Sequence, residues 1–512
     1  MSDWGKGYVT DIEYSDGFYG VQAPAHLELV GIINGIEAPS LDGPFAYCEL
    51  GCGRGQTSLV LAAINPEAEF HAVDFNPAHI AHAREKAQRA KLPNVQFHEI
   101  SFADLPGARG RELPMFDIVT MHGVWSWVAP DLQRAIIEFL NARLKPGGLV
   151  HLSYNALPAW NRIAPIQRLV KELTGTQDRS DRAIAQTIQQ IERLAQAKII
   201  PERLEEGVKR LKEHSHALLP YLAHEYLNEH WHPLYFADVA RSLTDAKLNF
   251  VGSGDLLKNF NNLMLNEEQR ALIADIPSAE LRETLKDFCI DHWFRQDLFV
   301  RGARRMSAAR REALLGALSI ALLRPAPPML EVQKPDGSRW RPDSDVYQTV
   351  GKALARSPGR IGELLHLEGL PAGHLVGPVE LLGILVGMGI AGLYRKPSVA
   401  QLQGAERLNA LLEHQDELVM SQSVTLAVPS LRTGVPLSPP SYLVYQSLRK
   451  GETPDADVLA TRFIKQCRAA GGHPIVDGKS YEDEREAQEV VRSDFETKLE
   501  SLVPLWRTNG II

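Results

Sequence analysis

Apolar runs alternate with amphipathic segments along the first third of this 512-residue chain. Five short runs are apolar enough to predict buried strands, at 45–50, 69–74, 95–100, 116–122 and 149–154. Helical spacing appears between them, at 56–64, 77–92 and 131–144. Regular alternation of strands and helices predicts right-handed crossovers and a parallel sheet that binds its ligand at the carboxyl ends of the strands.

The pattern changes after the fifth predicted strand. Residues 160–230 have the spacing of long, charged helices. Residues 236–253 then predict one helix followed by a sixth strand, and residues 295–301 fit an antiparallel seventh strand. We therefore predict an α/β domain with a helical insertion at about 160–230 and a smaller one at 254–290. An insertion in this place would shape a ligand site or form a dimer contact.

The middle of the chain begins with a proline-rich linker and hairpin at 324–343. Residues 344–396 follow in the order helix, turn, helix, apolar helix and short strand, which is winged-helix-like. The helix expected at 379–388 carries no Lys or Arg, so DNA binding is not favoured. We expect a protein-docking or structural module.

A second proline-rich break, at 428–440, leads into an acidic and mainly helical C-terminal segment. Together the breaks predict three domains, 1–305, 306–400 and 401–512.

The segment Tyr-Cys-Glu-Leu-Gly-Cys-Gly-Arg-Gly at 47–55 closes the first strand and opens the first helix. Its glycines Gly51, Gly53 and Gly55 allow a tight turn and a ligand close to the backbone. The second strand ends at Asp74, nineteen residues after Gly55. A carboxylate there is placed to accept two hydrogen bonds from a ribose diol.

Glu49, just before this turn, distinguishes between two ligands. A nicotinamide site would need G-x-G-x-x-G and a pyrophosphate at the helix N-terminus, which a nearby carboxylate opposes. S-adenosylmethionine carries a sulfonium and an ammonium and no phosphate, so a negative charge suits it. The pattern E-x-G-x-G-x-G at 49–55 therefore predicts S-adenosylmethionine as the ligand.

With its alternating elements, this stretch resembles a class I S-adenosylmethionine-dependent methyltransferase with a Rossmann-like sheet. In that family the residues after strand three hold the adenine, usually through an Asp. That place falls here on Ser101 and Phe102, which implies a hydroxyl or backbone contact plus ring packing. Asp104 is a weaker candidate, and Phe75 completes the expected cofactor contacts.

Further motifs narrow the resemblance. They are His-Gly-Val-Trp-Ser-Trp-Val at 122–128, Ser-Tyr-Asn-Ala-Leu-Pro at 153–158, Ala-His-Glu-Tyr-Leu-Asn at 223–228, Trp-His-Pro-Leu-Tyr at 231–235 and Phe-Arg-Gln-Asp at 294–297. They resemble the bacterial methyltransferases with a methyltransferase regulatory domain, the group containing the rickettsial protein-lysine methyltransferases. The resemblance covers most of the chain up to about Arg305. It implies N-methylation of lysine side chains on a protein substrate, a homodimer, and appended middle and C-terminal domains.

Aromatic and polar residues at the ends of strands four and five are the candidate acceptor-site residues. Trp125, Trp127, Tyr154 and Asn155 would line an apolar channel that lowers the pKa of a lysine amine by desolvation. Hydroxyl or carbonyl groups would orient the amine lone pair. His122 would pass a proton to solvent or serve only in packing. No dedicated catalytic base is predicted.

A metal site is not expected. The segment 224–228 resembles the zinc motif H-E-x-x-H, but Asn228 replaces the second ligand. His230 and His232 cannot both share a helix face with His224. A structural histidine or a place in the acceptor channel fits His224 better.

Composition excludes other classes. The net charge of −8 and the pI of about 6.1 argue against a nucleic-acid partner. Four cysteines, at 48, 52, 289 and 467, lack paired metal spacing and fit a reduced, cytoplasmic setting. Neither a signal peptide nor an apolar run of about 20 residues is visible, so membrane insertion is not expected.

Three alternatives remain open. The same core serves small-molecule N- or O-methyltransferases. A non-catalytic protein would sense S-adenosylmethionine through the same turn. The aromatic residues Tyr14, Phe18 and Tyr19, before the first strand, would act either as core residues or as a lid over the donor.

Overall fold

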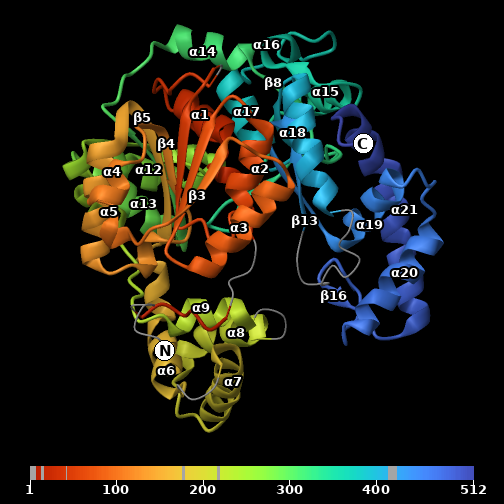
Figure 1. Cartoon of the computed structure of the whole chain (residues 1–512). Coiled ribbons are helices and arrows are strands. Elements are labelled where there is room, and N and C mark those ends of the chain that lie inside the picture. The colour runs from red at the N-terminus through yellow and green to blue at the C-terminus, as the bar shows by residue number, and fades with distance from the viewer. Residues whose placement is uncertain (1–6, 13–16, 42, 176–178, 216–218, 413–423) are drawn as a thin grey trace.

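The computed structural model describes residues 7–12, 17–41, 43–175, 179–215, 219–412 and 424–512. Its centre is a seven-stranded sheet in the order β3-β2-β1-β4-β5-β7-β6 (Figure 1). The strands are β1 Ala46–Leu50, β2 Glu69–Asp74, β3 Val95–Glu99, β4 Phe116–Met121, β5 Leu144–Asn155, β6 Leu248–Ser253 and β7 Phe294–Arg301. β1 to β5 are parallel, and β7 runs antiparallel to both β5 and β6. The α/β prediction and its antiparallel seventh strand are confirmed.

Helices cover both faces of this sheet because the central strands are apolar on both sides. In β1, Tyr47 faces a core that includes α1 Pro24–Ile33 and α2 Gln56–Ile64. Cys48 and Leu50 face the other core, with residues of α5 Pro130–Arg143 and α10 Phe236–Leu243. Successive strand residues alternate between faces, so a fully buried strand needs apolar residues throughout. α3 Pro77–Arg89 and the short α4 Ala108–Arg111 complete the connections.

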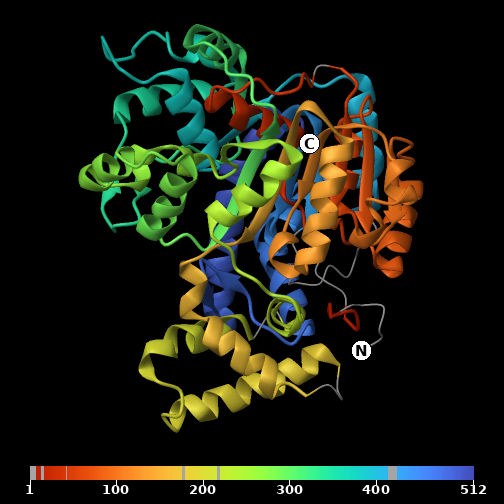
Figure 2. The same ribbon diagram turned by 90° about the vertical axis from the view of Figure 1, so that its left-hand side faces the viewer.

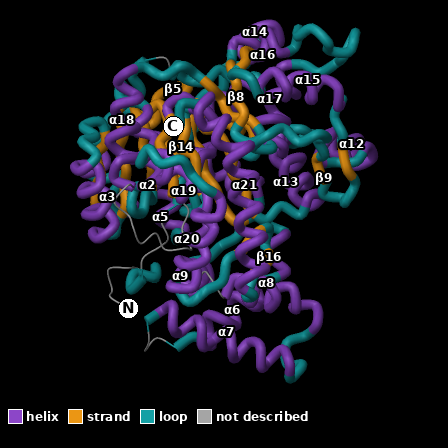
Figure 3. The backbone as a smooth tube through the Cα atoms, turned by 90° about the vertical axis from the view of Figure 1, so that its right-hand side faces the viewer, coloured by secondary structure: helices purple, strands orange, loops and turns teal. Residues whose placement is uncertain are grey.

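The helical insertion stands apart from the sheet. Its helices are α6 Ala164–Leu173, α7 Ser180–Gln196, α8 Glu205–Ser215 and α9 Leu219–Leu227. They pack around a hydrophobic cluster of their own, which includes Val170, Ile184 and Leu211. Figure 2 shows this yellow unit projecting below the sheet, and Figure 3 shows that it is built from helices without strands. The second insertion contains α11 Asn261–Met264, α12 Glu267–Ala274 and α13 Ala279–Ile290.

The middle region forms a small mixed unit. Its elements are α14 Ala308–Ala317, β8 Ser319–Leu322, β9 Val332–Gln333, β10 Arg339–Trp340, α15 Ser344–Leu354, β11 Gly359–Arg360, α16 Ile361–Leu364, α17 Pro378–Gly387 and β12 Ala391–Tyr394. The three-stranded sheet has β8 in its centre, between β11 and β12. A winged helix would instead pair a hairpin that follows its third helix. The winged-helix prediction is therefore not confirmed.

The C-terminal region is mainly helical, as the sequence predicts. It comprises α18 Val399–Asn409, β13 Val424–Val428, β14 Thr433–Leu437, α19 Pro439–Arg449, α20 Ala456–Ala469, β15 Ile475–Val476, β16 Lys479–Ser480 and α21 Glu484–Thr508. α18 lies beside α2 (Figure 1). There the Gln401 side-chain amide donates to the carbonyl of Ile64 at 3.0 Å. The three-domain division stays a prediction.

Among the described helices, none is both long and apolar enough to cross a membrane.

Candidate functional site

A cavity of about 940 Å³ opens at the carboxyl ends of β1 to β5. Its walls come from the loops after these strands, the segment before α1, helices α8 and α9, and residues 293–294 at the start of β7. The cavity therefore lies where the parallel sheet was expected to bind its ligand. It also reaches the insertion, so one space joins the glycine turn to α9.

The glycine turn lies against this cavity. Gly51 and Gly53 adopt positive φ angles of 74° and 52°, and both line the cavity. A Cβ on Gly51 would lie 2.5 Å from Cγ2 of Val124. Gly55 does not line the cavity, because it packs the start of α2 against β3. A Cβ there would lie 2.4 Å from the ring of Phe97.

Asp74 connects the second strand to the glycine turn. Its Oδ2 accepts a hydrogen bond from the Gly53 amide at 2.9 Å, and its Oδ1 accepts one from the Asn76 amide at 2.9 Å. His79 Nδ1 lies 3.4 Å from the same Oδ1. A carboxylate has about four acceptor positions, so two backbone bonds leave capacity for a ligand. Asp74 lines the cavity.

Glu49 is a buried carboxyl group beneath the turn. The Ser58 hydroxyl donates to its Oε2 at 2.5 Å, and the Gln22 amide donates to its Oε1 at 3.3 Å. Burial raises the pKa of Glu49 to about 7, since desolvation disfavours the charged form. A cationic ligand beside it would restore the charge.

The residues expected at the adenine also line the cavity, namely Ser101 and Phe102 after β3 and Phe75 after β2. The Ser101 hydroxyl accepts a bond from the Ala103 amide at 3.4 Å. Asp104 and Phe75 lie on the same wall. This part of the cavity combines polar groups with aromatic rings.

The segment before α1 covers the cavity from another side. Tyr8 meets Phe75 edge to face, with ring centroids 5.8 Å apart. Tyr19 stacks on His122 at 3.8 Å between ring centroids. Both tyrosines line the cavity, whereas Phe18 packs against Gly434 of β14. Tyr14 lies outside the described residues.

Tyr154 and Asn155, the two acceptor-site candidates at the end of β5, point to opposite faces of the sheet. Asn155 lines the cavity, and its buried Nδ2 has no hydrogen-bond partner among the described residues. Tyr154 points to the other face, where its hydroxyl donates to Oδ2 of Asp297 at 2.7 Å. Neighbouring strand residues face opposite sides, so both could not reach one channel. The structure does not bring Tyr154 to the cavity.

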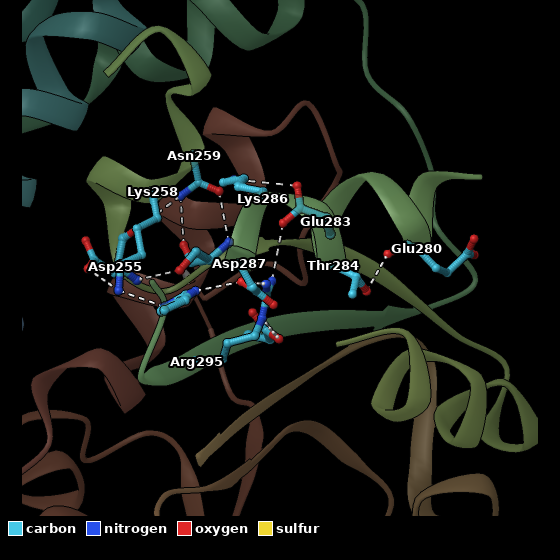
Figure 4. A network of polar contacts seen from close by, with 12 residues as sticks. Asp255, Lys258, Asn259, Glu280, Glu283, Thr284, Lys286, Asp287 and Arg295 are labelled. Carbon is cyan, nitrogen blue, oxygen red and sulfur yellow. Dashed lines mark hydrogen bonds and ion pairs between the residues drawn. The ribbon is translucent and has the colours of Figure 1, made fainter. Parts of the chain in front are cut away.

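Asp297 belongs to a buried ionic network behind β5. Arg295 donates through Nε to Asp297 at 2.8 Å and through Nη1 to Asp287 at 2.6 Å. Figure 4 shows Arg295, Asp287 and Glu283 within this network. Burial raises the pKa of Asp287 to about 6, although Arg295 acts in the opposite direction. The network fixes the start of β7, directly after the cavity residue Trp293.

Of the three remaining candidates for the acceptor site, two line the cavity and one does not. Trp125 is only 1% exposed and lies in the core beneath the cavity, away from its wall. Trp127, two residues on, lines the cavity. His122 lines it too, and burial lowers the pKa of His122 to about 3, so the ring is neutral.

Several cavity residues were not predicted as site residues from the sequence. Trp160 and Trp293 form an aromatic corner, with ring centroids 5.5 Å apart. The guanidinium of Arg210 lies 5.2 Å and 4.9 Å from the centroids of these two rings. Tyr221 and Glu225 face the same space from α9. The motif at 223–228 was a signal for this wall, because Glu225 lies at its centre.

The same motif has a structural role in Asn228. Its Oδ1 accepts a bond from the Val9 amide at 2.9 Å, and its Nδ2 donates to the carbonyl of His224 at 2.7 Å. Asn228 thus ties the segment before α1 to the insertion. Within the described part of the chain, no group of three or more side chains is arranged to hold a metal.

Comparison with known proteins identifies the fold and the family. A methyltransferase domain model matches residues 48–150, and a "predicted methyltransferase regulatory domain" model matches residues 219–301. The protein sll1526 of Synechocystis sp. is 32% identical over 99% of both chains. The Rickettsia prowazekii protein RP789 is 26% identical over 57% of this chain and 54% of its own.

Among solved structures, PKMT2 from Rickettsia typhi covers 97% of this chain and 99% of its own, with a TM-score of 0.64 and 18% identity. It was also solved in complex with AdoHcy. The sheet and glycine turn define a class I methyltransferase. The chain belongs to the class I S-adenosylmethionine-dependent methyltransferases with a methyltransferase regulatory domain. It is an enzyme that uses S-adenosylmethionine as methyl donor.

Proposed function

We propose that this enzyme methylates lysine side chains of a protein substrate. The observation that carries the proposal is the aromatic section of the cavity, walled by Trp127, Trp160, Trp293 and Tyr221. Rings of this kind surround an aliphatic stem and attract a cationic end group. A lysine side chain has both features, and it is long enough to reach a buried donor from a protein surface.

The donor side of the cavity fits S-adenosylmethionine through groups of this chain. The remaining acceptor positions of Asp74 suit the ribose diol, and Glu49 suits a cationic amino-acid end. The proposed contacts are Glu49, Gly51, Gly53, Asp74, Phe75, Ser101 and Phe102. Gly55 would contribute through packing of α2, because it does not face the cavity.

The acceptor amine must be neutral to attack, yet a free lysine has a pKa of about 10.4. An aromatic wall disfavours the ammonium by desolvation and lowers that pKa. The amine lone pair then needs alignment with the methyl–sulfur bond at about 3 Å. Asn155 would orient the amine by accepting a hydrogen bond from one of its N–H groups at the side-chain carbonyl, and neutral His122 lines the same cavity. No metal is needed, since the sulfonium already activates the methyl group.

A homodimer formed through α6–α9 is part of this proposal, supported by the projection of that unit from the body (Figure 2). Light scattering of the intact protein tests it, and a monomeric mass would reject it. The cytoplasmic location and the absence of a nucleic-acid partner stay predictions.

Transfer of labelled methyl groups tests the acceptor class. The protein is incubated with labelled S-adenosylmethionine and a lysate of its host, and the protein fraction is separated from small molecules. Label recovered as methyl-lysine after acid hydrolysis supports the proposal. Label found only in small molecules would instead identify a metabolite N- or O-methyltransferase.

A further inference from the structure

Among the described residues of the insertion, Glu225 is the acidic residue that lines the cavity. It lies on α9 and lines the same cavity as the glycine turn. Across the described residues, no hydrogen bond or ion pair reaches its carboxylate. Glu225 is half-buried where it lines the cavity. Carboxyl groups in enclosed places are normally paired or hydrogen-bonded, so one without such a partner beside a cavity is a candidate to bind a ligand.

Ionisable groups from three elements interact electrostatically with Glu225. They are Tyr8 and Tyr19 from the segment before α1, Arg210 from α8, and Tyr221 and Tyr226 from α9 itself. Burial raises the pKa of Glu225 to about 8, and the charge of Arg210 acts in the opposite direction. Arg210 does not form a salt bridge with Glu225, and its guanidinium lies over the rings of Trp160 and Trp293.

The two tyrosines before α1 connect Glu225 to the donor side. Tyr8 is influenced electrostatically by both Asp74 and Glu225. Tyr19 is influenced by both Glu49 and Glu225, and these carboxylates with burial raise its pKa to about 12. Glu225 therefore lies within electrostatic range of the same two rings as the donor-side carboxylates. Tyr8, Tyr19 and Glu225 also line the same cavity as the glycine turn.

We infer that Glu225 binds the ammonium group of the acceptor and takes its proton before methyl transfer. This inference rests on the proposed function, since it requires an amine acceptor. The proton moves from the ammonium to the carboxylate, which leaves a neutral amine. The nitrogen lone pair forms the bond to the methyl carbon while the carbon–sulfur bond breaks and its electrons stay on sulfur. The products are a methylammonium group and S-adenosylhomocysteine, and Glu225 returns its proton to solvent.

A simpler alternative is that Glu225 serves only to balance the charge of Arg210. The two ideas differ in what they predict for ligands. A site for an ammonium group prefers an amine to an alcohol of the same shape, whereas an internal charge pair has no such preference.

Binding of n-butylamine and 1-butanol to the intact protein, saturated with S-adenosylhomocysteine, tests the inference by calorimetry. The amine must pair with a carboxylate that is protonated below about pH 8 in the free cavity. Its affinity should therefore rise about tenfold per pH unit from pH 6 to 7.5, whereas butanol affinity should stay constant. Equal pH dependence for both ligands in the unaltered protein would overturn the inference without any variant.

Glu225→Gln should weaken butylamine binding at pH 8 by about tenfold or more and remove its pH dependence. Glu172→Gln is the matched control, because it removes an exposed carboxylate of α6 that pairs with Arg168 outside the cavity. Unchanged amine binding in a folded Glu225→Gln protein would also reject the inference.

Single-turnover methylation of n-butylamine, followed by mass spectrometry, separates binding from proton transfer. The unaltered enzyme should reach its maximum rate just above pH 8. The Glu225→Gln rate should keep rising towards pH 10, where the free amine is neutral without a protein base. Parallel pH profiles would show that Glu225 takes no proton. Failure of lysate labelling combined with selective amine binding would reject the protein acceptor and keep the Glu225 site.

Discussion

The amide of Gly53 donates a hydrogen bond to Oδ2 of Asp74 at 2.9 Å, so the glycine turn is held by the same carboxylate that faces the ligand space. The backbone at Gly53 is also open on the side where a Cβ would point, because no described atom lies within 4 Å of that position. One carboxylate therefore organises the turn and contributes to the wall of the cavity. Loss of Asp74 should therefore weaken donor binding twice, because the glycine turn loses its support and the donor loses a carboxylate contact.

Asp74→Ala should weaken S-adenosylmethionine binding by roughly 1.5–3 kcal/mol, the cost of leaving charged hydrogen bonds unmade. Isothermal calorimetry measures the change. Asp104→Ala is the comparison, since it removes an exposed carboxylate from the same cavity and should cost less than about 0.5 kcal/mol. Equal losses in both variants would contradict the placement of the ribose at Asp74.

Gly51→Ala should nearly abolish donor binding, because its Cβ would lie 2.5 Å from Val124 and the turn would have to move. Gly147→Ala is the control, because Gly147 has a similar positive φ of 81°, compared with 74° at Gly51. Gly147 lies near the start of β5, and no described atom lies within 4 Å of a Cβ built on it. Both variants should lose stability, and only Gly51→Ala should lose affinity. Comparable affinities by calorimetry would show that the close packing at Gly51 is unimportant.

Glu49 should make stability depend on pH. Its pKa is raised by burial from 4.5 to about 7, so the folded protein holds a proton that the unfolded chain has lost. This contribution is fully present below pH 4.5 and is lost as the pH rises through 7. Between pH 5.5 and 8, the unfolding free energy of Glu49→Gln should improve by roughly 2 kcal/mol relative to the unaltered protein. Urea titrations without donor at both pH values measure this difference.

The same carboxyl group should make donor affinity pH-dependent. A cationic ligand favours the charged form, so S-adenosylmethionine should bind more tightly as the pH rises from 6 to 8. In Glu49→Gln the affinity should be lower and independent of pH over this range. A pH dependence that survives in Glu49→Gln would assign it to another group.

Tyr154→Phe tests whether the Tyr154 hydroxyl stabilises the fold or takes part in catalysis. Removal of the hydroxyl leaves Asp297 without the bond at 2.7 Å, which should cost roughly 1–3 kcal/mol of stability. Donor affinity and the methyl-transfer rate should stay within about twofold, because the ring faces away from the cavity. A large loss of rate with unchanged stability would restore Tyr154 as a catalytic residue.

The cavity wall proposed to bind the donor could be anticipated from the sequence because its residues lie in short, contiguous motifs. Glu49, the glycines and Asp74 follow strand ends, and strand order then brings those ends together. The sequence analysis placed Tyr154 and Asn155 in one channel, although strand alternation requires neighbouring residues to face opposite sides. Trp125 and Trp127 were both expected in the acceptor channel. A short 3-10 helix at 125–127 instead buries Trp125 in the core and leaves Trp127 lining the cavity.

The acceptor wall was harder to predict because it joins residues from distant segments. Trp160 and Trp293 are in contact, yet no sequence pattern links them. Domain boundaries are equally hard to predict, because the C-terminal region packs on the first part of the chain. α18 lies against α2, and Arg407 donates to the carbonyl of Ala90 at 3.2 Å. Such long-range packing depends on shape and leaves no periodic signal in either segment.

Gly404→Ala tests whether the contact between α18 and α2 supports the catalytic core. Alanine in place of a helical glycine normally stabilises a protein by about 1 kcal/mol. At Gly404, however, the new Cβ would lie 2.2 Å from the carbonyl oxygen of Ala63, which is backbone and cannot rotate away. We therefore expect a net destabilisation of roughly 1–3 kcal/mol from overpacking.

Gly316→Ala is the matched control, because it places the same substitution within α14, where the nearest atom lies 4.0 Å from the new Cβ. This variant should gain stability, so the two substitutions should have opposite signs in urea unfolding. Donor affinity should fall only in Gly404→Ala, since α2 carries the helix end of the glycine turn. A stabilised Gly404→Ala protein with normal affinity would show that α18 can separate from α2 without cost.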